Sequence, residues 1–232
     1  MMQINPIAHI RTAFPEKFGI PRQSGLAGNL RARIVFEPEY HNPDALRGLD
    51  EFSHLWLIWE FSANRRGDKD MATCPWQPTV RPPRLGGNER MGVFATRSPF
   101  RPNPLGLSCV QIESIETDGP EGPVINVLGA DLMDGTPIYD IKPYVKYADA
   151  RPHAVCGYVD RLEEKRLKVV LSPEVAACVA DRTMIPSLVE ILALDPRPSY
   201  HEDAERVYGL SFYGYNVRFK VDGDTLTVVE ID

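Results

Sequence analysis

An unusual cluster of arginines and prolines occupies the middle of this chain. Residues 81–101 contain five arginines and one acidic residue, a local excess of four positive charges in a chain of net charge −6. Guanidinium groups bind carboxylates and phosphates through paired hydrogen bonds and also stack on aromatic rings. Three prolines stiffen residues 97–104, so Arg97, Arg101 and Asn103 would lose little backbone entropy on binding. The cluster therefore predicts a site for an anionic or aromatic ligand.

A second stretch with chemical potential is residues 131–144, DLMDGTPIYDIKPY. It begins with a turn at Asp134, Gly135 and Thr136, where the bare glycine lets a ligand approach the backbone closely. Asp140 and Lys142 follow at alternate positions, as in a strand with one wet face.

The elements that must position these stretches are mostly strands. Seven prolines between residues 75 and 104 exclude a helix there, and residues 92–96 and 105–112 read as strands. Further strands are predicted at residues 4–10, 31–37, 52–61 and 124–132, with a short helix beginning after the N-cap Asn42. The near-continuous apolar run 52–61 indicates a strand buried on both faces. Six or seven strands with almost no helix predict a closed or nearly closed β-barrel.

The composition changes after residues 149–152, where a linker is expected. Residues 153–232 read as a small α+β part, with helices starting at Ser172 and near Pro186. Residues 210–221 and 226–231 are predicted to form a hairpin across Asp222-Gly223-Asp224. Strict alternation along its first strand places Asn216 and Arg218 on one face.

Several classes of protein are disfavoured. The apolar runs are too short to cross a bilayer as a helix, and the N-terminus lacks the pattern of a signal peptide. Four scattered cysteines without a CxxC pair argue against a zinc site or a disulfide framework and favour the cytoplasm. The chain lacks the βαβ pattern and GxGxxG fingerprint of a Rossmann fold. Its acidic pI of about 5.5 means that any nucleic acid must bind to local basic patches.

Residues 91–108, MGVFATRSPFRPNPLGLS, closely resemble the signature of the TsaA-like (TrmO) family, and residues 131–144 and 195–200 resemble two further motifs of it. The resemblance covers nearly the whole chain. It implies a TsaA-like β-barrel at residues 4–148 that binds S-adenosylmethionine, and a C-terminal domain at residues 153–232 that contributes to tRNA recognition. The implied reaction is methylation of N(6)-threonylcarbamoyladenosine, next to the anticodon of tRNA on its 3′ side. The resemblance also implies a homodimer, and the implied reaction needs no metal.

The resemblance assigns roles to individual positions. The residues implied in cofactor binding are Pro21, Arg22, Gln23, Ser62, Ala63, Arg97, Leu107, Asp134, Gly135 and Thr136. The residues expected to bind the tRNA and its threonyl group are Arg84, Arg101, Asn103, Arg197, Tyr200, Asn216 and Arg218. No residue is assigned as the catalytic base, although the acceptor nitrogen is a poor nucleophile until its proton leaves.

Other interpretations remain at this point. Arginines in such loops also form ordinary surface ion pairs, and a hairpin with a polar face is often simply solvated. The chain could be a methyltransferase of the same fold acting on another adenosine derivative, or a non-catalytic module that binds adenosine or RNA. The motif at residues 195–200 favours the tRNA methyltransferase, because TsaA-like proteins with other roles often lack it.

Overall fold

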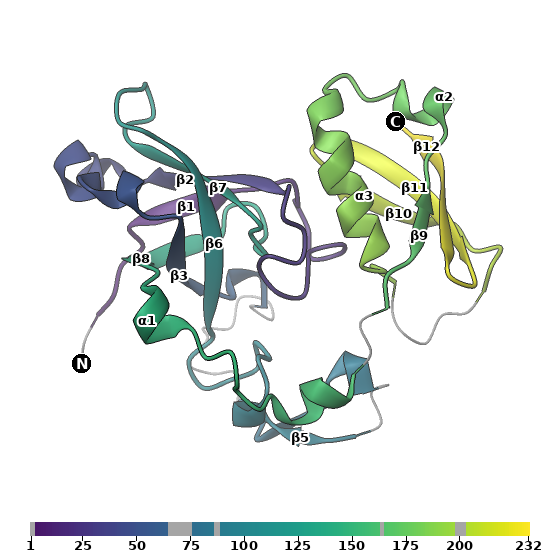
Figure 1. Ribbon diagram of the computed structural model, residues 1–232, viewed down its shortest axis with the longest axis horizontal. Coiled ribbons are helices and arrows are strands. Elements are labelled where there is room, and N and C mark those ends of the chain that lie inside the picture. Colours follow the sequence, from purple (N-terminus) through teal and green to yellow (C-terminus); the bar gives the residue numbers. More distant parts are fainter. Residues whose placement is uncertain (1–2, 65–75, 86–88, 163–164, 198–202) are drawn as a thin grey trace.

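A closed antiparallel barrel forms the N-terminal part of the molecule (Figure 1). The computed structural model describes residues 3–64, 76–85, 89–162, 165–197 and 203–232. The barrel strands are β1 (Ala8–Arg11), β2 (Arg31–Phe36), β3 (His54–Glu60), β6 (Leu105–Glu116), β7 (Val124–Leu128) and β8 (Pro137–Pro143), in the order β1-β2-β7-β6-β3-β8. The predicted fold class, mainly β with a closed barrel, is confirmed.

Alternation of side chains explains the barrel wall. In β2, Ala32, Ile34 and Phe36 point inward and are buried, whereas Arg31 and Arg33 are exposed. Strand β3 follows the same rule, so the prediction that it is buried on both faces is wrong: Leu55, Leu57 and Trp59 are buried, but Trp56 and Ile58 between them are only half-buried. A closed barrel has one inner face, and the outer face of β3 is only partly covered.

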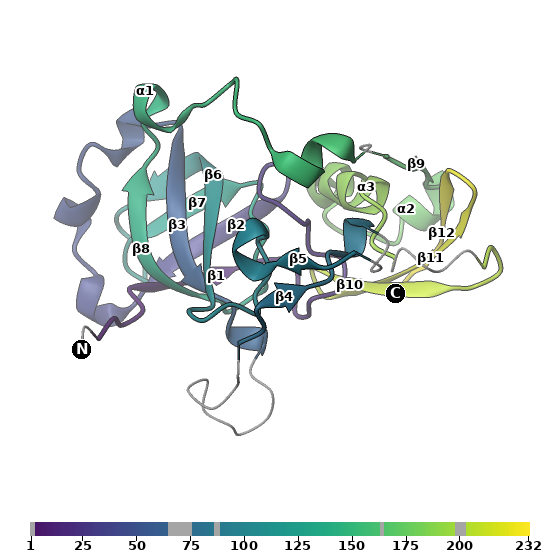
Figure 2. The same ribbon diagram turned by 90° about the horizontal axis from the view of Figure 1, so that it is seen from below.

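Other predicted boundaries shift for local reasons. The strand predicted at residues 92–96 is only β5 (Met91–Gly92), followed by a 3-10 helix at Val93–Ala95. Its partner β4 (Thr79–Val80) is just as short, because two prolines follow it almost at once. This two-stranded sheet lies outside the barrel wall (Figures 1 and 2). The strand predicted at 124–132 ends at Leu128, before Gly129 with φ 78°.

Helical structure in the barrel part is short. The side chain of Asn42 accepts a hydrogen bond from the N–H of Asp44 at 3.0 Å, which confirms it as a cap. The predicted helix is two 3-10 turns, Pro43–Leu46 and Leu49–Glu51, because Gly48 between them has φ 83°. The helix α1 (Lys146–Asp149) lies over β3, where Asp149 accepts a hydrogen bond from the indole of Trp56 at 3.1 Å.

The C-terminal part is a four-stranded sheet with helices packed on one face. Its strands are β9 (Lys168–Val170), β10 (Tyr208–Phe212), β11 (Tyr215–Asp222) and β12 (Thr225–Ile231), in the order β10-β11-β12-β9. The helices are α2 (Pro173–Ala176) and α3 (Ile185–Ala193). The predicted turn at Asp222-Gly223-Asp224 is confirmed, but the strand predicted at 210–221 is two strands, because Tyr213 (φ 49°) and Gly214 (φ 84°) form a turn.

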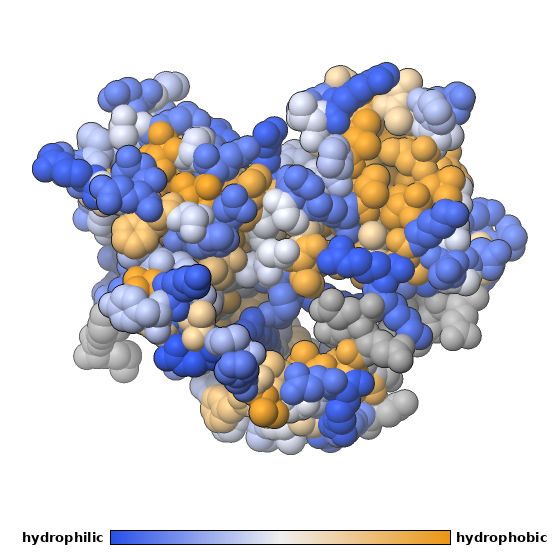
Figure 3. All heavy atoms as spheres, viewed as in Figure 1, coloured by the Kyte–Doolittle hydropathy of each residue, from blue (hydrophilic) through white to orange (hydrophobic). Residues whose placement is uncertain are grey.

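Residues 12–30 hold the two parts of the molecule together by packing. They leave the barrel after β1, yet Ala13, Phe14, Ala27 and Leu30 are buried in the core of the C-terminal sheet. The ring of Phe14 packs on that of Phe212 with centroids 5.7 Å apart. Figure 3 shows a notch between the two parts on one face. The packing of residues 12–30 on the C-terminal sheet joins the two parts.

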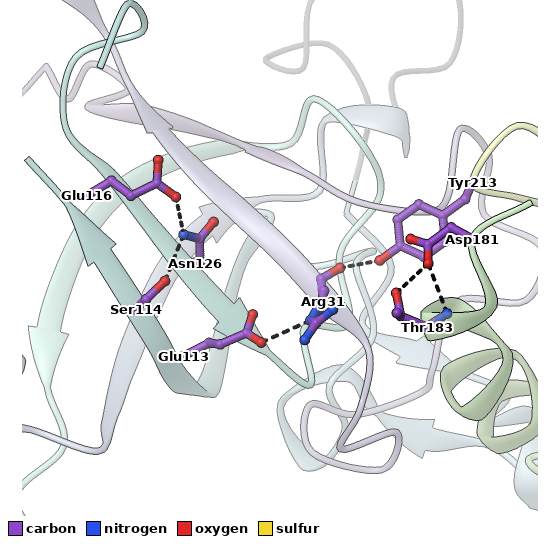
Figure 4. A network of polar contacts seen from close by, with 8 residues as sticks. All are labelled: Arg31, Glu113, Ser114, Glu116, Asn126, Asp181, Thr183 and Tyr213. Carbon is purple, nitrogen blue, oxygen red and sulfur yellow. Dashed lines mark hydrogen bonds and ion pairs between the residues drawn. The ribbon is translucent and has the colours of Figure 1, made fainter. Parts of the chain in front are cut away.

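Polar contacts strengthen the same junction (Figure 4). The hydroxyl of Tyr213 donates to the carbonyl of Arg31 at 2.8 Å, and its N–H donates to the carbonyl of Ala13 at 3.1 Å. The side chain of Arg31 pairs with Glu113 of the barrel at 2.9 Å. The turn that interrupts the predicted hairpin therefore joins the C-terminal sheet to the barrel.

Candidate functional site

A cavity of about 450 Å³ lies at one end of the barrel. Its wall is built from five segments that are far apart in the sequence: the loop at residues 17–23, the end of β3 with the turn after it, the loop at residues 96–101, the start of β6, and the loop between β7 and β8. Its volume is in the range of pockets that hold small organic ligands.

Most of the residues predicted to bind the cofactor meet in this cavity. Eight of the ten line it, together with one residue predicted to bind the substrate; these are Pro21, Arg22, Gln23, Ser62, Ala63, Arg97, Leu107, Thr136 and Arg101. They come from every segment of the wall, so the closure of the barrel brings them together.

The remaining two predicted cofactor residues, Asp134 and Gly135, hold the loop between β7 and β8 against β1. The carboxylate of Asp134 accepts from the N–H of Thr12 at 3.0 Å and pairs with Arg11 at 3.6 Å. Gly135 has φ 73°, and its N–H donates to the carbonyl of Ile10 at 2.8 Å. The turn thus fixes Thr136 at the cavity wall, while its own first two residues are outside the lining.

The two arginines of the proline-rich loop behave differently. Arg97 is exposed and crosses to the loop at residues 17–23, where it donates to the side-chain oxygen of Gln23. Arg101 is half-buried and donates to two carbonyls of its own loop, those of Thr96 at 3.1 Å and Ser98 at 3.3 Å. Arg97 therefore connects two walls of the cavity, and Arg101 shapes the loop from within.

Two carboxylates in the cavity wall, Asp131 and Glu60, were not among the predicted site residues. Asp131 accepts a hydrogen bond from the hydroxyl of Ser108 at 2.5 Å, and Ser108 accepts one from the indole of Trp59 at 3.0 Å. Burial raises the pKa of Asp131, and the Ser108 bond and the charge of Arg97 oppose that rise. Both Asp131 and Glu60 stand at the end of an apolar stretch that was predicted as a strand, and this position is the sequence feature that could have identified them.

Glu60 ends β3 and is 5% exposed. The phenol of Tyr139 on β8 donates to it at 2.5 Å. Opposite, the strand β6 passes close under the ring of Trp59: a Cβ on Gly106 would lie 2.2 Å from an atom of that ring. Glycine at this position is therefore required for the ring to form part of the cavity wall.

Four other residues predicted to bind the substrate, Asn103, Arg197, Asn216 and Arg218, lie outside the cavity lining. Asn103 is exposed in the proline-rich loop. Arg197 is 12% exposed and forms a two-point ion pair with Asp195, with N–O distances of 2.9 and 3.0 Å. The side chain of Arg84 and the whole of Tyr200 lie outside the described residues.

Asn216 and Arg218 lie on β11 of the C-terminal sheet. The backbone of Asn216 exchanges hydrogen bonds with Asp232. Arg218 pairs with Glu230 at 2.8 Å and with Asp232 at 3.8 Å, and both it and its partners are substantially exposed. Alternation along the strand is as predicted, since Val217 between them and Phe219 after Arg218 are fully buried.

A second cavity of about 140 Å³ lies behind the loop at residues 17–23. It shares Lys17, Ile20, Pro21 and Arg22 with the first cavity, and its other wall is the end of α3 with Asp195 and Pro196. The motif at residues 195–200 thus begins directly behind the loop that carries three predicted cofactor residues.

The main cavity combines cations, carboxylates and apolar rings. Lys17, Arg22, Arg97 and Arg101 line it together with Glu60 and Asp131, and aromatic, aliphatic and small polar residues make up the rest of its wall. Among the described residues, no three histidine, cysteine, aspartate or glutamate side chains converge as metal ligands, and no helix is long and apolar enough to span a membrane. The arrangement suits a small ligand that carries charges of both signs beside an aromatic group.

Comparison with known proteins gives consistent matches for both parts of the chain. Residues 9–150 match the tRNA-methyltransferase O N-terminal domain, and residues 164–232 match the TrmO C-terminal domain. A tRNA (adenine(37)-N6)-methyltransferase of Escherichia coli is 40% identical, over 94% of this chain and 93% of that protein. A protein of Pseudomonas aeruginosa that carries the name of an S-adenosylmethionine-dependent methyltransferase is 39% identical, over 93% of this chain and 91% of its own length.

Solved structures agree with the sequence comparisons. The crystal structure of TrmO from Pseudomonas aeruginosa superimposes with a TM-score of 0.78 and 31% identity, covering 100% of this chain and 98% of that one. Two family models that together span nearly the whole sequence, and relatives of matching length, show that the chain belongs to the TrmO family of tRNA methyltransferases.

Proposed function

We propose that this protein transfers the methyl group of S-adenosylmethionine to the N6 nitrogen of threonylcarbamoyladenosine at position 37 of tRNA. The observation that carries the proposal is the cavity at the end of the barrel, where eight predicted cofactor residues converge in a chain similar to a tRNA (adenine(37)-N6)-methyltransferase. The acceptor base is next to the anticodon, on its 3′ side.

The residues of the cavity fit the proposed cofactor. S-Adenosylmethionine has an adenine ring, a cationic sulfonium and an amino acid end, and when bound it supplies an activated methyl group. Arg22 and Arg97 provide cations for its carboxylate, Glu60 provides an acidic group, and Leu107, which is 56% exposed, provides an apolar surface. Thr136 and Ala63 also line the cavity.

The chain's own contribution to catalysis is mainly position. The stiff loop that carries Arg97 and the loop that carries Gln23 are held together by their mutual hydrogen bond. Holding two reactants in line lowers the barrier by removing entropy that a bimolecular reaction would lose.

We assign the tRNA to the arginine-rich side of the cavity. Arg101 faces the cavity, where its guanidinium would bind the threonyl carboxylate, and Arg84 and Asn103 lie in the same basic stretch. Because the chain has a net charge of −6, the phosphate contacts must come from this local excess of arginine.

The C-terminal part is proposed to form a further wall for the substrate. Same-face side chains in a strand are roughly 7 Å apart, so Asn216 and Arg218 could contact one ligand. Arg197 and Tyr200 are assigned to the same surface by the family motif. The division into a barrel at residues 4–148 and a C-terminal domain at 153–232, a homodimer and a cytoplasmic location complete the proposal.

Mass spectrometry of tRNA nucleosides tests this function directly. The protein is incubated with S-adenosylmethionine and tRNA that carries threonylcarbamoyladenosine, and a gain of one methyl group on that nucleoside is expected. Matched tRNA without the threonylcarbamoyl group is the control and should gain nothing. Methylation of the control would favour a related enzyme with another adenosine substrate, and binding without any methylation would favour a non-catalytic module.

A chelator in the same assay tests the absence of a metal requirement. Calorimetry should show the same affinity for S-adenosylmethionine with and without the chelator, because the proposed contacts are side chains alone. Loss of binding on chelation would contradict the proposed site.

A further inference from the structure

The proposed reaction requires a proton acceptor that no sequence motif supplies. The N6 nitrogen of threonylcarbamoyladenosine carries one hydrogen, and its electron pair is delocalised into the purine ring and the neighbouring carbonyl. It becomes a good nucleophile only as that hydrogen leaves. A group in the cavity wall must therefore accept the proton close to the site of methyl transfer.

Few groups of the wall are able to accept a proton. Among the described residues that line the cavity, the titratable groups are Lys17, Arg22, Glu60, Arg97, Arg101 and Asp131. Arginine stays protonated in proteins, and an ordinary lysine is a cation at neutral pH, although burial lowers the pKa of Lys17. Neither type of side chain is anionic, so neither has the negative charge that draws a proton from an N–H group. The choice is between the two carboxylates, Glu60 and Asp131.

The surroundings of Asp131 fix one oxygen of its carboxylate. The indole N–H of Trp59 on β3 donates to the hydroxyl of Ser108 on β6, at 3.0 Å. Because the Ser108 oxygen accepts this hydrogen bond, its own proton is free to be donated. The Ser108 hydroxyl donates it to a carboxylate oxygen of Asp131, at an O–O distance of 2.5 Å. Asp131 as a residue is half-buried, and it lines the cavity from the loop between β7 and β8 that also carries Thr136.

Glu60 is less accessible than Asp131. Only 5% of this residue is exposed, and the phenol of Tyr139 donates to its carboxylate at 2.5 Å. This hydrogen bond comes from the neighbouring barrel strand β8. Glu60 is placed to contribute charge to the cavity, whereas a nucleoside would have to displace its surroundings to reach it.

We infer that Asp131 is the general base that removes the N6 proton of the acceptor nucleoside, with Ser108 as the residue that positions it. This inference rests on the proposed methylation of threonylcarbamoyladenosine. As the N–H bond breaks, the proton moves to a carboxylate oxygen of Asp131. The electron pair of the nitrogen forms the new bond to the methyl carbon, and the electrons of the broken carbon–sulfur bond stay on sulfur. The products are the methylated nucleoside, S-adenosylhomocysteine and a protonated Asp131, which returns its proton to water.

The charges around Asp131 suit a base. Burial is the largest influence and raises the pKa of Asp131 above that of an exposed aspartate, so the carboxylate binds a proton more readily. The hydrogen bond from Ser108, the charge of Arg97 and the backbone of Ser24 lower it and oppose full neutralisation. The raised pKa makes this carboxylate a stronger base than an aspartate in water.

The test compares Asp131→Asn with Glu60→Gln, since both changes keep the shape of the side chain and remove its charge. Methylation of threonylcarbamoyladenosine in tRNA is measured across a range of pH. In the wild type, kcat/KM should fall on the acidic side as Asp131 is protonated. Asp131→Asn should lower kcat roughly a hundredfold to ten-thousandfold and abolish the acidic limb. Glu60→Gln should keep the limb, whatever its rate, and loss of the limb in that variant would overturn the inference.

Ser108→Ala gives an independent signature. The hydrogen bond from Ser108 lowers the pKa of Asp131, so its removal should shift the acidic limb to higher pH. A mere loss of packing would lower the rate without moving the limb. An unchanged limb in Ser108→Ala would contradict the positioning role.

Binding measurements separate a base from a counter-ion. Calorimetry with S-adenosylmethionine and with S-adenosylhomocysteine, which lacks the sulfonium charge, should give affinities within about threefold of the wild type for Asp131→Asn. A selective loss for the charged compound would show that Asp131 balances the sulfonium instead. If the wild type does not methylate the nucleoside at all, the proposed function fails; if it does and Asp131→Asn matches it, only the assignment of the base fails.

Discussion

Gly19 couples the cofactor loop to the C-terminal sheet. It lies in the loop at residues 17–23 with φ 87°, which is left-handed backbone that favours glycine. A Cβ at this position would lie 2.2 Å from a methyl carbon of Leu210 on β10. Leu210 is fully buried in the C-terminal core, so it has little space into which to move. We predict that Gly19→Ala destabilises the protein and weakens binding of S-adenosylmethionine.

The magnitude follows from two separate costs. A left-handed conformation costs a residue with a Cβ about 1–2 kcal/mol. Forcing an extra methyl group into a packed core costs about 1–3 kcal/mol more. The matched control is Gly25→Ala, because Gly25 has φ 79° but a Cβ added there would meet no atom within 4 Å beyond its chain neighbours. The control should therefore show the conformational cost alone, about 1–2 kcal/mol.

Urea unfolding of the two variants measures the difference in the free energy of unfolding, and calorimetry measures cofactor affinity. Combining Gly19→Ala with Leu210→Ala should cost less than the two single changes added together, because the smaller side chain relieves the clash. If Gly19→Ala and Gly25→Ala lose the same stability, the loop does not pack on the sheet as described. If stability falls but cofactor affinity is unchanged, the sheet does not hold the cofactor loop in place.

Three further predictions concern the cavity and the substrate. Gly106→Ala would place a methyl group in the indole ring above it, so we expect a loss of about 1–3 kcal/mol in the free energy of unfolding and weaker cofactor binding by calorimetry; unchanged values would contradict the close contact. Arg101→Glu should reduce tRNA affinity, measured by filter binding, more than Lys168→Glu does, and should flatten the dependence of affinity on salt; equal effects would place the RNA elsewhere. Replacing Asn216 and Arg218 by alanine should reduce methyl transfer while leaving cofactor affinity intact, and full turnover in that double variant would exclude the proposed wall.

Local patterns in the sequence were sufficient for many elements of this fold. Asn42 and Ser172 accept hydrogen bonds at the starts of their helices, because capping depends on the residues directly around the helix end. The Asp222-Gly223 turn forms because its glycine reaches φ 58° without strain. Alternation in β11 correctly separated buried from exposed side chains.

The residues of the site were predicted from the family resemblance. The closed barrel places most of the predicted cofactor residues in one cavity. The segments that carry Gln23, Arg97 and Thr136 are distant in the sequence, and their common cavity depends on the pairing of strands between them. Non-local pairing of this kind leaves no mark in a short window of sequence. The strand predicted at residues 92–96 failed for the same reason, because its length was limited by its partner.

Only the tertiary structure showed the burial of Phe14 and the hydrogen-bond partners of Asp131. Phe14 reads as loop material in the sequence, yet it is fully buried against the C-terminal sheet. Asp131 reads as one polar residue among several, and only the meeting of β3, β6 and the loop after β7 gives it Ser108, Trp59 and a raised pKa. The physical reason is that burial and electrostatic environment are properties of neighbours in space, whereas the sequence specifies only neighbours along the chain.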